Sequence, residues 1–356
     1  MLKKHPILKW SLISIVSLIT IVVSFGFWFI SLIPKDMTRV SILDTKPKDL
    51  EYVSSGLPKT RGKILIVVTS HDRMTETKKT GYELTELARP YYVFQANGFE
   101  VDIASPKGGE PPVVIDNDDM GDYDFAFLND ASAQKKVKNS LEVEAVKADE
   151  YEAVFFAGGK GAVFDFPQNQ AIQNLIRNRY ESGKVVAAVC HGPAALVNVT
   201  LQDGSSLVAN KKVSGFTNEE ELFLIPNASE VFPFLLQDEL SKNGADFQEG
   251  EMYLQNVCQD GNLITGQNPW STWAVAESVI KQLGYTPVTR KVTAEENGIA
   301  ILNTYETNGF DAADKKIHEF LLGNKSFSHE LIAVHSIVAV MQWEIGKAVD
   351  LIRLLA

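Results

Sequence analysis

The sequence predicts an α/β fold in which a mostly parallel sheet is covered by helices on both faces. Short β-branched apolar runs alternate with segments of helical periodicity, and glycine-containing turns follow several of the runs. The chain has 356 residues, 45% of them hydrophobic and 22% charged, which is ordinary for a globular protein with a sizeable core. An apolar N-terminal segment and a helical C-terminal segment flank this predicted domain.

The N-terminal segment has the composition of a membrane anchor. No charged residue occurs in Trp10–Ile33, and this run is longer than the 20 or so residues that a helix needs to span a bilayer. Lys3, Lys4 and Lys9 precede it without any acid, which predicts a cytoplasmic N-terminus. We therefore predict that residues 1–34 are a cytoplasmic start and a transmembrane signal anchor. The predicted localisation is a single-pass membrane protein with its catalytic domain on the extracytoplasmic side. A cleaved signal peptide and a buried core helix are the alternatives.

The elements of the central domain follow in order. Residues 35–61 are polar and indicate a linker or a surface wrap, and the α/β domain is predicted over residues 62–285. Strands are expected at Lys63–Ser70, Phe99–Ser105, Ala153–Ala157 and Lys184–Val189, and helices at Glu83–Ala96 and Asn169–Glu181. Because ligand sites of parallel sheets lie at the carboxyl ends of the strands, functional side chains are expected there.

The C-terminal residues 286–356 are predicted to be a helical extension. Asp311–Leu322 and Ser328–Leu355 are both periodic and rich in apolar residues. Ile332–Trp343 is too short for a membrane span, which favours a buried helix or one that packs on a partner subunit.

Charge and cysteine content exclude several classes of protein. The formal net charge is −11, and an acidic surface repels nucleic acid. Cys190 and Cys258 are the only cysteines, which is too few for a disulfide framework or a four-cysteine zinc site. Pairing of one with the other stays open at this point.

The segment Val185–Leu196 carries the strongest chemical signal. A buried strand delivers Cys190 onto a tight turn, and a helix is predicted to begin directly behind it at Pro193. This is the arrangement of a nucleophile elbow. A helix N-terminus favours a thiolate, so we expect a lowered pKa for Cys190 and a higher reactivity than for Cys258. The alternative is a small buried cysteine at the end of a strand.

The motif AVCHGP, which contains Cys190, resembles the nucleophile motif of the ThiJ/PfpI superfamily, and within it the branch of glutathione-independent glyoxalases and heat-shock chaperones. Further segments resemble this branch in the same order: Thr80–Pro90, Phe99–Gly109, Phe156–Pro167, Ser214–Leu236 and Gly261–Pro269. The resemblance covers about residues 63–284. It implies a flavodoxin-like fold, which is shared with the class I glutamine amidotransferases.

The resemblance also implies catalytic roles. Cys190 matches the family's nucleophile and His191 its adjacent histidine. Glu221 matches the acid that orients this histidine, with Glu220 as a rival one position away. A histidine oriented by a carboxylate keeps one tautomer, which a proton acceptor requires.

A second acid and two backbone amides complete the implied site. Glu86 matches the buried acid next to the cysteine, with Glu83 as its rival. An acid held away from water near a thiol is expected to keep its proton at neutral pH. The backbone N–H groups of Gly159 and His191 would form an oxyanion hole. No metal ligands can be matched, so neither a metal nor another cofactor is expected.

The implied activity is that of a lyase of the D-lactate dehydratase or glyoxalase III type. It would convert a 2-oxoaldehyde such as methylglyoxal into a 2-hydroxy acid such as D-lactate, with a cysteine nucleophile; repair of glycated protein by the same residues is a related possibility. The alternatives are a PfpI-like peptidase, which is a hydrolase, and a stress-related holdase chaperone. An amidotransferase is disfavoured because no His-x-Glu follows Cys190. Relatives suggest a homodimer, and the apolar N-terminal segment suggests the membrane as a further partner.

Overall fold

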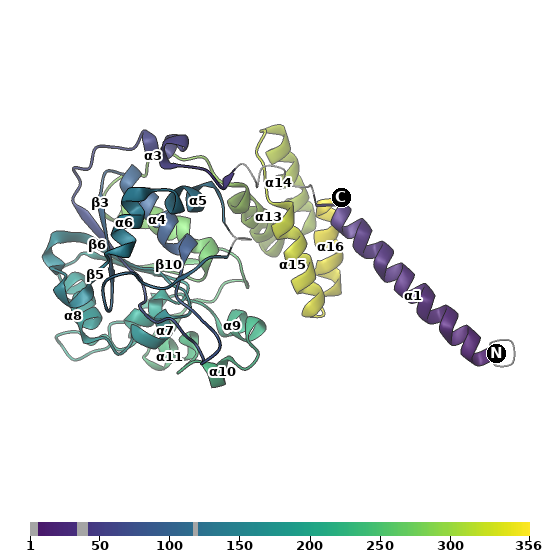
Figure 1. Ribbon diagram of the computed structural model, residues 1–356, viewed down its shortest axis with the longest axis horizontal. Coiled ribbons are helices and arrows are strands. Elements are labelled where there is room, and N and C mark those ends of the chain that lie inside the picture. Colours follow the sequence, from purple (N-terminus) through teal and green to yellow (C-terminus); the bar gives the residue numbers. More distant parts are fainter. Residues whose placement is uncertain (1–5, 34–41, 117–119) are drawn as a thin grey trace. The chain divides into compact units, whose positions relative to one another are not determined.

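The computed structural model describes residues 6–33, 42–116 and 120–356. The chain divides into two compact units, Thr38–Lys291 and Met1–Met37 together with Val292–Ala356. Figure 1 shows the strands gathered in the first unit and the C-terminal helices of the second.

A seven-stranded sheet forms the centre of the larger unit, with the strand order β10-β11-β7-β6-β1-β3-β5. Its strands are β1 (Lys63–Val67), β3 (Glu100–Ser105), β5 (Leu141–Glu142), β6 (Tyr151–Phe156), β7 (Val185–Val189), β10 (Val257–Asp260) and β11 (Leu263–Gly266). Only the β10–β11 pair is antiparallel; the other neighbours run parallel. Two small parallel pairs lie outside this sheet: β2 (Tyr82–Glu83) with β4 (Val113–Val114), and β8 (Lys212–Val213) with β9 (Asp246–Phe247). Phe156 pairs with Ala188, so β6 and β7 end side by side.

Helices cover both faces of the sheet. Every position of β7 is buried, which requires cover on both sides because successive side chains point to opposite faces. Helix α4 (Leu84–Ala96) packs on α12 (Thr272–Gln282), and α8 (Gln170–Glu181) packs on β6 and β7. The other α-helices are α3 (Glu51–Ser54), α5 (Asp122–Leu128), α6 (Ala131–Lys138), α7 (Ala162–Asp165), α9 (Asn218–Leu224), α10 (Ala228–Val231) and α11 (Leu236–Lys242). Short 3₁₀ turns are η2 (Pro47–Asp49), η3 (Val143–Ala145), η4 (Ala148–Glu150), η5 (Gly192–Leu196) and η6 (Pro269–Ser271). The predicted flavodoxin-like α/β fold is confirmed.

The residues before β1 wrap onto this unit. The first part of the predicted linker 35–61 lies outside the described residues. From residue 42 onward the chain contains α3, which packs on α4. The side chain of Tyr52 is buried, and its hydroxyl accepts a hydrogen bond from Asn97 Nδ2 at 3.1 Å. A surface wrap therefore describes this segment better than a free linker.

The C-terminal extension is helical, as predicted. It consists of α13 (Ala294–Asn308), α14 (Phe310–Leu322), α15 (His329–Met341) and α16 (Ile345–Leu355). Helix α13 packs on α14 and α15, and α16 packs on the same two helices. The single periodic segment predicted over Ser328–Leu355 is two helices, because the chain turns at Trp343, whose φ is +64°. Part of the apolar surface of the extension is thus buried, including Ile301, Ile332 and Leu351, while other apolar side chains of α15 stay exposed.

The predicted transmembrane anchor is contradicted. The apolar segment forms α1 (Pro6–Ser31), while the first five residues lie outside the described part of the chain. The prediction counted apolar residues along the sequence, whereas a span requires one helix that is both long and apolar enough to cover the hydrocarbon core. No helix within residues 6–33, 42–116 and 120–356 meets that requirement. The predicted single-pass localisation and membrane partner are corrected with it.

Candidate active site

Cys190 occupies a strained turn at the carboxyl end of β7. Its φ is +59°, a left-handed conformation that costs energy for any residue with a Cβ atom. The backbone on both sides is held in place: the Cys190 N–H donates to the carbonyl oxygen of Gly266 at 2.9 Å, and the N–H of Phe216 donates to the Cys190 carbonyl oxygen at 2.9 Å. The sharp turn predicted from the sequence is present.

The helix predicted behind the cysteine is much shorter than expected. It is the five-residue 3₁₀ turn η5, not an α-helix, so it supplies little helix dipole. Burial raises the pKa of the Cys190 thiol, and the nearby carboxyl group of Glu86 adds to the rise. The expected lowering of this pKa is therefore wrong for the free protein. The contribution from Glu86 depends on its charge and vanishes when Glu86 is protonated.

His191 connects Cys190 to an acid. Its Nδ1 lies 3.3 Å from Cys190 Sγ, and its Nε2 lies 2.5 Å from Glu221 Oε2. The imidazole is 1% exposed and packs beside the rings of Phe216 and Phe232, with centroids 4.6 Å and 6.3 Å away. We infer that the Nε2–H group of His191 donates a hydrogen bond to the Glu221 carboxylate. The lone pair of Nδ1 is then free to accept the thiol proton.

The structure separates Glu221 from its rival Glu220. Burial acts to raise the pKa of Glu221, but His191 beside it holds that pKa below its usual value. Glu220 points elsewhere, and its Oε2 accepts hydrogen bonds from the backbone and hydroxyl of Thr217. Its Oε1 accepts three more, from the Tyr253 N–H and the side-chain amides of Gln267 and Asn268. Glu220 thus links α9 to the segments that contain Tyr253 and Asn268, whereas Glu221 faces the histidine.

Glu86 is buried beside the thiol. It lies in the first turn of α4, is completely buried, and its Oε2 accepts a hydrogen bond from the Gly158 N–H at 2.7 Å. Burial raises its pKa to about 8, against smaller opposing effects that include an interaction with Cys190. Its rival Glu83 contacts the same turn through its backbone N–H, which donates to the Gly158 carbonyl oxygen at 3.3 Å. The geometry therefore brings Glu86 to the thiol, with its proton retained at neutral pH.

Two glycines allow the turn after β6 to approach this closely. A Cβ atom on Gly158 would lie 2.5 Å from Glu86 Oε2 and 2.8 Å from the His191 nitrogen. Gly159 has a φ of +94°, which favours glycine, and a Cβ there would lie 2.4 Å from the Gly81 carbonyl oxygen. Within the described part of the chain, the N–H groups of Gly159 and His191 have no backbone acceptor. Both predicted oxyanion donors are thus available.

One charged residue of this turn received no role from the sequence. Lys160 directly follows Gly159 and is half-buried. The position was visible in the glycine-rich motif, but nothing in the sequence shows which groups a flexible lysine side chain reaches.

The described residues offer no evident metal site. No three side chains of His, Cys, Asp or Glu among them are grouped so as to hold a metal ion. Cys190 and Cys258 are both free thiols, which excludes the disulfide left open by the sequence.

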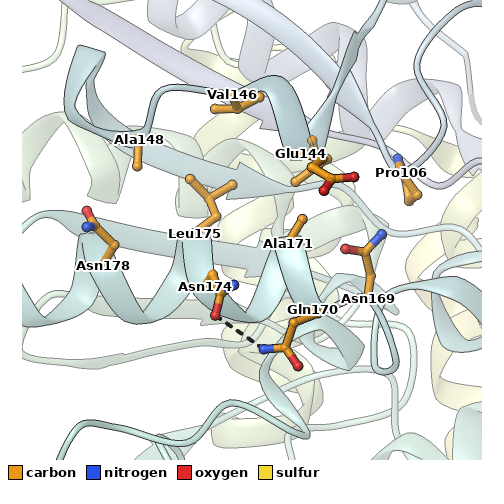
Figure 2. A pocket seen from close by; sticks show the side chains of 11 residues that line it. Pro106, Glu144, Val146, Ala148, Asn169, Gln170, Ala171, Asn174, Leu175 and Asn178 are labelled. Atoms are coloured by element: carbon orange, nitrogen blue, oxygen red, sulfur yellow. Dashed lines mark hydrogen bonds between the residues drawn. The ribbon is translucent and has the colours of Figure 1, made fainter.

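A groove of about 540 Å³ lies along α8 and the segment around η3 and η4. Figure 2 shows amide side chains of α8 along it, with Gln170 Nε2 donating to Asn174 Oδ1 at 3.2 Å, and Glu144 across from them. None of the candidate catalytic residues lines this groove. It therefore has no part in the chemistry considered below.

The fold and this arrangement of residues define a class of α/β protein. The sequence pattern of the DJ-1/PfpI family matches residues 77–224, and the chain belongs to this family. This confirms the predicted ThiJ/PfpI membership.

The relatives narrow the class further. The chain is 30% identical over 228 residues to Glyoxalase 3 of Candida albicans, covering 61% of this chain and 97% of that protein. It is 30% identical over 236 residues to the glutathione-independent glyoxalase HSP31 of Saccharomyces cerevisiae, covering 62% and 98%.

Solved structures agree with these relatives. The Rapid Encystment Protein 24 kDa of Francisella tularensis has 37% identity and a TM-score of 0.60, covering 62% of this chain and 99% of that one. Candida albicans glyoxalase III has 28% identity and a TM-score of 0.57, covering 62% and 97%.

Proposed function

We propose that this protein is a glutathione-independent glyoxalase that converts a small 2-oxoaldehyde, such as methylglyoxal, into a 2-hydroxy acid, such as D-lactate. The observation that carries the proposal is the set of contacts around Cys190, namely His191, which is held by Glu221, and the buried Glu86. Two curated relatives named as glyoxalases, each about 30% identical, support it.

Burial of the site favours a small substrate. Cys190 is 4% exposed and His191 1% exposed. A folded protein or a peptide would have to open the site before its reacting carbon could reach Sγ. A three-carbon aldehyde requires far less room, so we favour it over a glycated protein or a peptide.

The first step is addition of the thiolate to the aldehyde. His191 Nδ1 accepts the thiol proton, and the Glu221 carboxylate stabilises the resulting imidazolium. A bond forms between Sγ and the aldehyde carbon, and the C=O π electrons move onto oxygen. The N–H groups of Gly159 and His191 stabilise this oxyanion. The proton of Glu86 then neutralises it, which gives a hemithioacetal.

The second step moves hydrogen between neighbouring carbons. Glu86, now ionised, removes the proton from the carbon bonded to sulfur, and an enediolate forms. Glu86 returns the proton to the adjacent carbon, and His191 transfers a proton between the two oxygens. The result is a thioester of the 2-hydroxy acid. Water attacks the thioester carbonyl carbon and the C–S bond breaks. The protonated His191 returns its proton to the departing Cys190 sulfur, and the acid product returns a proton to Glu86, so the overall reaction consumes one aldehyde and one water.

The test is lactate formation from methylglyoxal without glutathione, using the full chain. Replacement of Glu86 by Gln should lower the rate roughly 10²-fold or more, because an amide cannot move the proton. Glu83→Gln, on the same turn of chain, is the matched control and should retain the rate. Absence of lactate with the unaltered protein, or full activity in Glu86→Gln, would overturn the proposal.

A holdase chaperone is the second candidate, and one surface favours it. Helix α15 exposes four apolar side chains on one side: Val334, Ile337, Val340 and Met341. Such a stripe can bind unfolded chains. If it does, Cys190→Ala should still suppress aggregation of a heated client protein, whereas Ile337→Glu should not. Equal suppression by both variants would reject this surface.

A further inference from the structure

Lys160 occupies a position next to the predicted oxyanion donors. It follows Gly159 in the turn between β6 and α7, and this turn packs against both the Cys190 loop and Glu86. Two residues before it, the Gly158 N–H binds the Glu86 carboxyl group. The turn that positions the acid therefore also carries the lysine.

In the part of the chain that the structure describes, the ammonium group of Lys160 has no ion-pair or hydrogen-bond partner. Among the described residues it forms no salt bridge within 4 Å and no side-chain hydrogen bond, and the side chain is only partly exposed. Arg89, another cation near Glu86, is instead paired with Asp124 at 3.2 Å. A half-buried lysine whose ammonium has no ion-pair partner among the described residues is suited to an anion that forms during a reaction.

The charge of Lys160 reaches three groups from three different elements. It acts to lower the pKa of Cys190 at the end of β7, of Glu86 in α4 and of Glu221 in α9. Two acids act on the thiol in the opposite sense when they are ionised, namely Glu86 and Glu220. Lys160 thus supplies the positive charge that offsets the acids around Cys190.

We propose that Lys160 is the cation that stabilises the Cys190 thiolate and the oxyanion formed when this thiolate attacks a carbonyl carbon. The first half concerns the free protein alone. The second half rests on the proposed glyoxalase function. In the addition step the negative charge moves from sulfur to oxygen, and the positive charge of Lys160, the residue that follows Gly159, would stabilise it on both atoms. No proton has to leave the lysine.

Alkylation of Cys190 tests the first half without requiring any enzymatic activity. The rate of iodoacetamide labelling at Cys190, followed by peptide mass spectrometry from pH 6 to 11, gives the midpoint of thiol ionisation. Lys160→Met should move this midpoint upward, and Lys160→Arg should restore most of the shift. Lys184→Met is the matched control, since Lys184 precedes β7 at the opposite end of the strand from Cys190. It should leave the midpoint unchanged.

Ionic strength provides an independent measurement on the unaltered protein. Added salt screens a partly exposed charge such as that of Lys160, so the Cys190 midpoint should rise more with salt, or fall less, in the unaltered protein than in Lys160→Met. An unchanged midpoint in Lys160→Met, or equal shifts in the Met and Arg variants, would overturn the inference. If the Met variant misfolds, Lys160→Gln provides the same comparison and should also move the midpoint upward.

The kinetics separate this inference from the proposed function. With methylglyoxal, Lys160→Met should lower kcat/KM roughly 10-fold, less than the loss of a fully buried oxyanion donor. A shifted midpoint in a protein that forms no lactate would support the lysine and reject the glyoxalase. Lactate formation with an unshifted midpoint would support the glyoxalase and reject the role of Lys160.

Discussion

The two cysteines of this chain lie on neighbouring parts of one sheet and differ in what surrounds them. Cys190 ends β7 inside the sheet, while Cys258 lies in the edge strand β10, opposite Thr265 of β11. Burial raises the pKa of both thiols. Of the two, Cys190 adjoins a histidine–carboxylate pair, a buried acid with a raised pKa and, within the described residues, backbone N–H groups without a backbone acceptor. A free thiol therefore does not by itself indicate a catalytic site in this protein. The side chains and backbone groups around Cys190 do.

The largest expected difference between the two regions concerns activity. Cys190→Ser should reduce lactate formation roughly 10³-fold or more, because a hydroxyl in the same place is a far weaker nucleophile. Cys258→Ser should retain the rate, since no catalytic group adjoins it. Steady-state rates of both purified variants measure this. Similar losses in the two would remove the distinction on which the comparison depends.

A second difference concerns stability, because burial of the Glu86 carboxyl in the Cys190 region lowers the free energy of unfolding at high pH. The pKa of Glu86 is about 8 in the folded protein and near 4.5 in the unfolded chain. Folding thus favours the protonated form, so this contribution is complete below about pH 4.5 and is lost as the pH rises through about 8. Glu86→Gln has no carboxyl at this position and therefore lacks this pH-dependent loss of stability. Its free energy of unfolding relative to the unaltered protein should rise across this window, by on the order of a few kcal/mol.

Urea unfolding at pH 5 and pH 9 measures this change. Glu83→Gln, which alters a carboxyl of the same segment that is not completely buried, should show no such dependence on pH. A constant difference between Glu86→Gln and the unaltered protein would mean that Glu86 is ionised in the folded state at neutral pH.

A smaller effect separates two adjacent acids of α9. Glu221→Gln should reduce the rate roughly 10–100-fold, as is usual when the group that orients a functional histidine is lost, with little change in melting temperature. Glu220→Gln should instead lower the melting temperature, because a Gln side chain cannot accept all five of the hydrogen bonds that Glu220 receives. Measuring both properties for both variants tests the assignment. The reverse pattern would exchange their roles.

The sequence predicted the strands of the sheet and the turn at Cys190 because their signals are local. Val185–Val189 is a continuous apolar run, and the glycines after β6 mark a close approach of chain segments. Pro90 lies inside α4, which continues through it to Ala96. A proline penalty of a few kcal/mol is offset where, as here, nearly the whole helix is buried.

Other features depend on distances that a sequence does not contain. Helix α13 lies within the predicted helical extension, but its bounds were not predicted, because its apolar positions form no strong stripe. Its start carries a capping box of Thr293 and Glu296, which is a local signal. The pairing of His191 with Glu221 joins residues 30 positions apart, and only the family resemblance suggested it. The raised pKa of Cys190 required its burial to be known.

The last prediction returns to the two thiols and asks which of them responds to Glu86. The carboxyl of Glu86 raises the pKa of Cys190, whereas the charges acting on Cys258 are those of Lys212 and Asp246. Glu86→Gln should therefore lower the pH midpoint of iodoacetamide labelling at Cys190 and leave that at Cys258 unchanged, measured in the same digest. Glu83→Gln should move neither. Because protonated Glu86 carries no charge, the lowering should come mainly from data above about pH 8, where its carboxylate forms. A shift at both cysteines would indicate a general loosening of the sheet, and a shift at neither would place Glu86 outside electrostatic reach of the thiol.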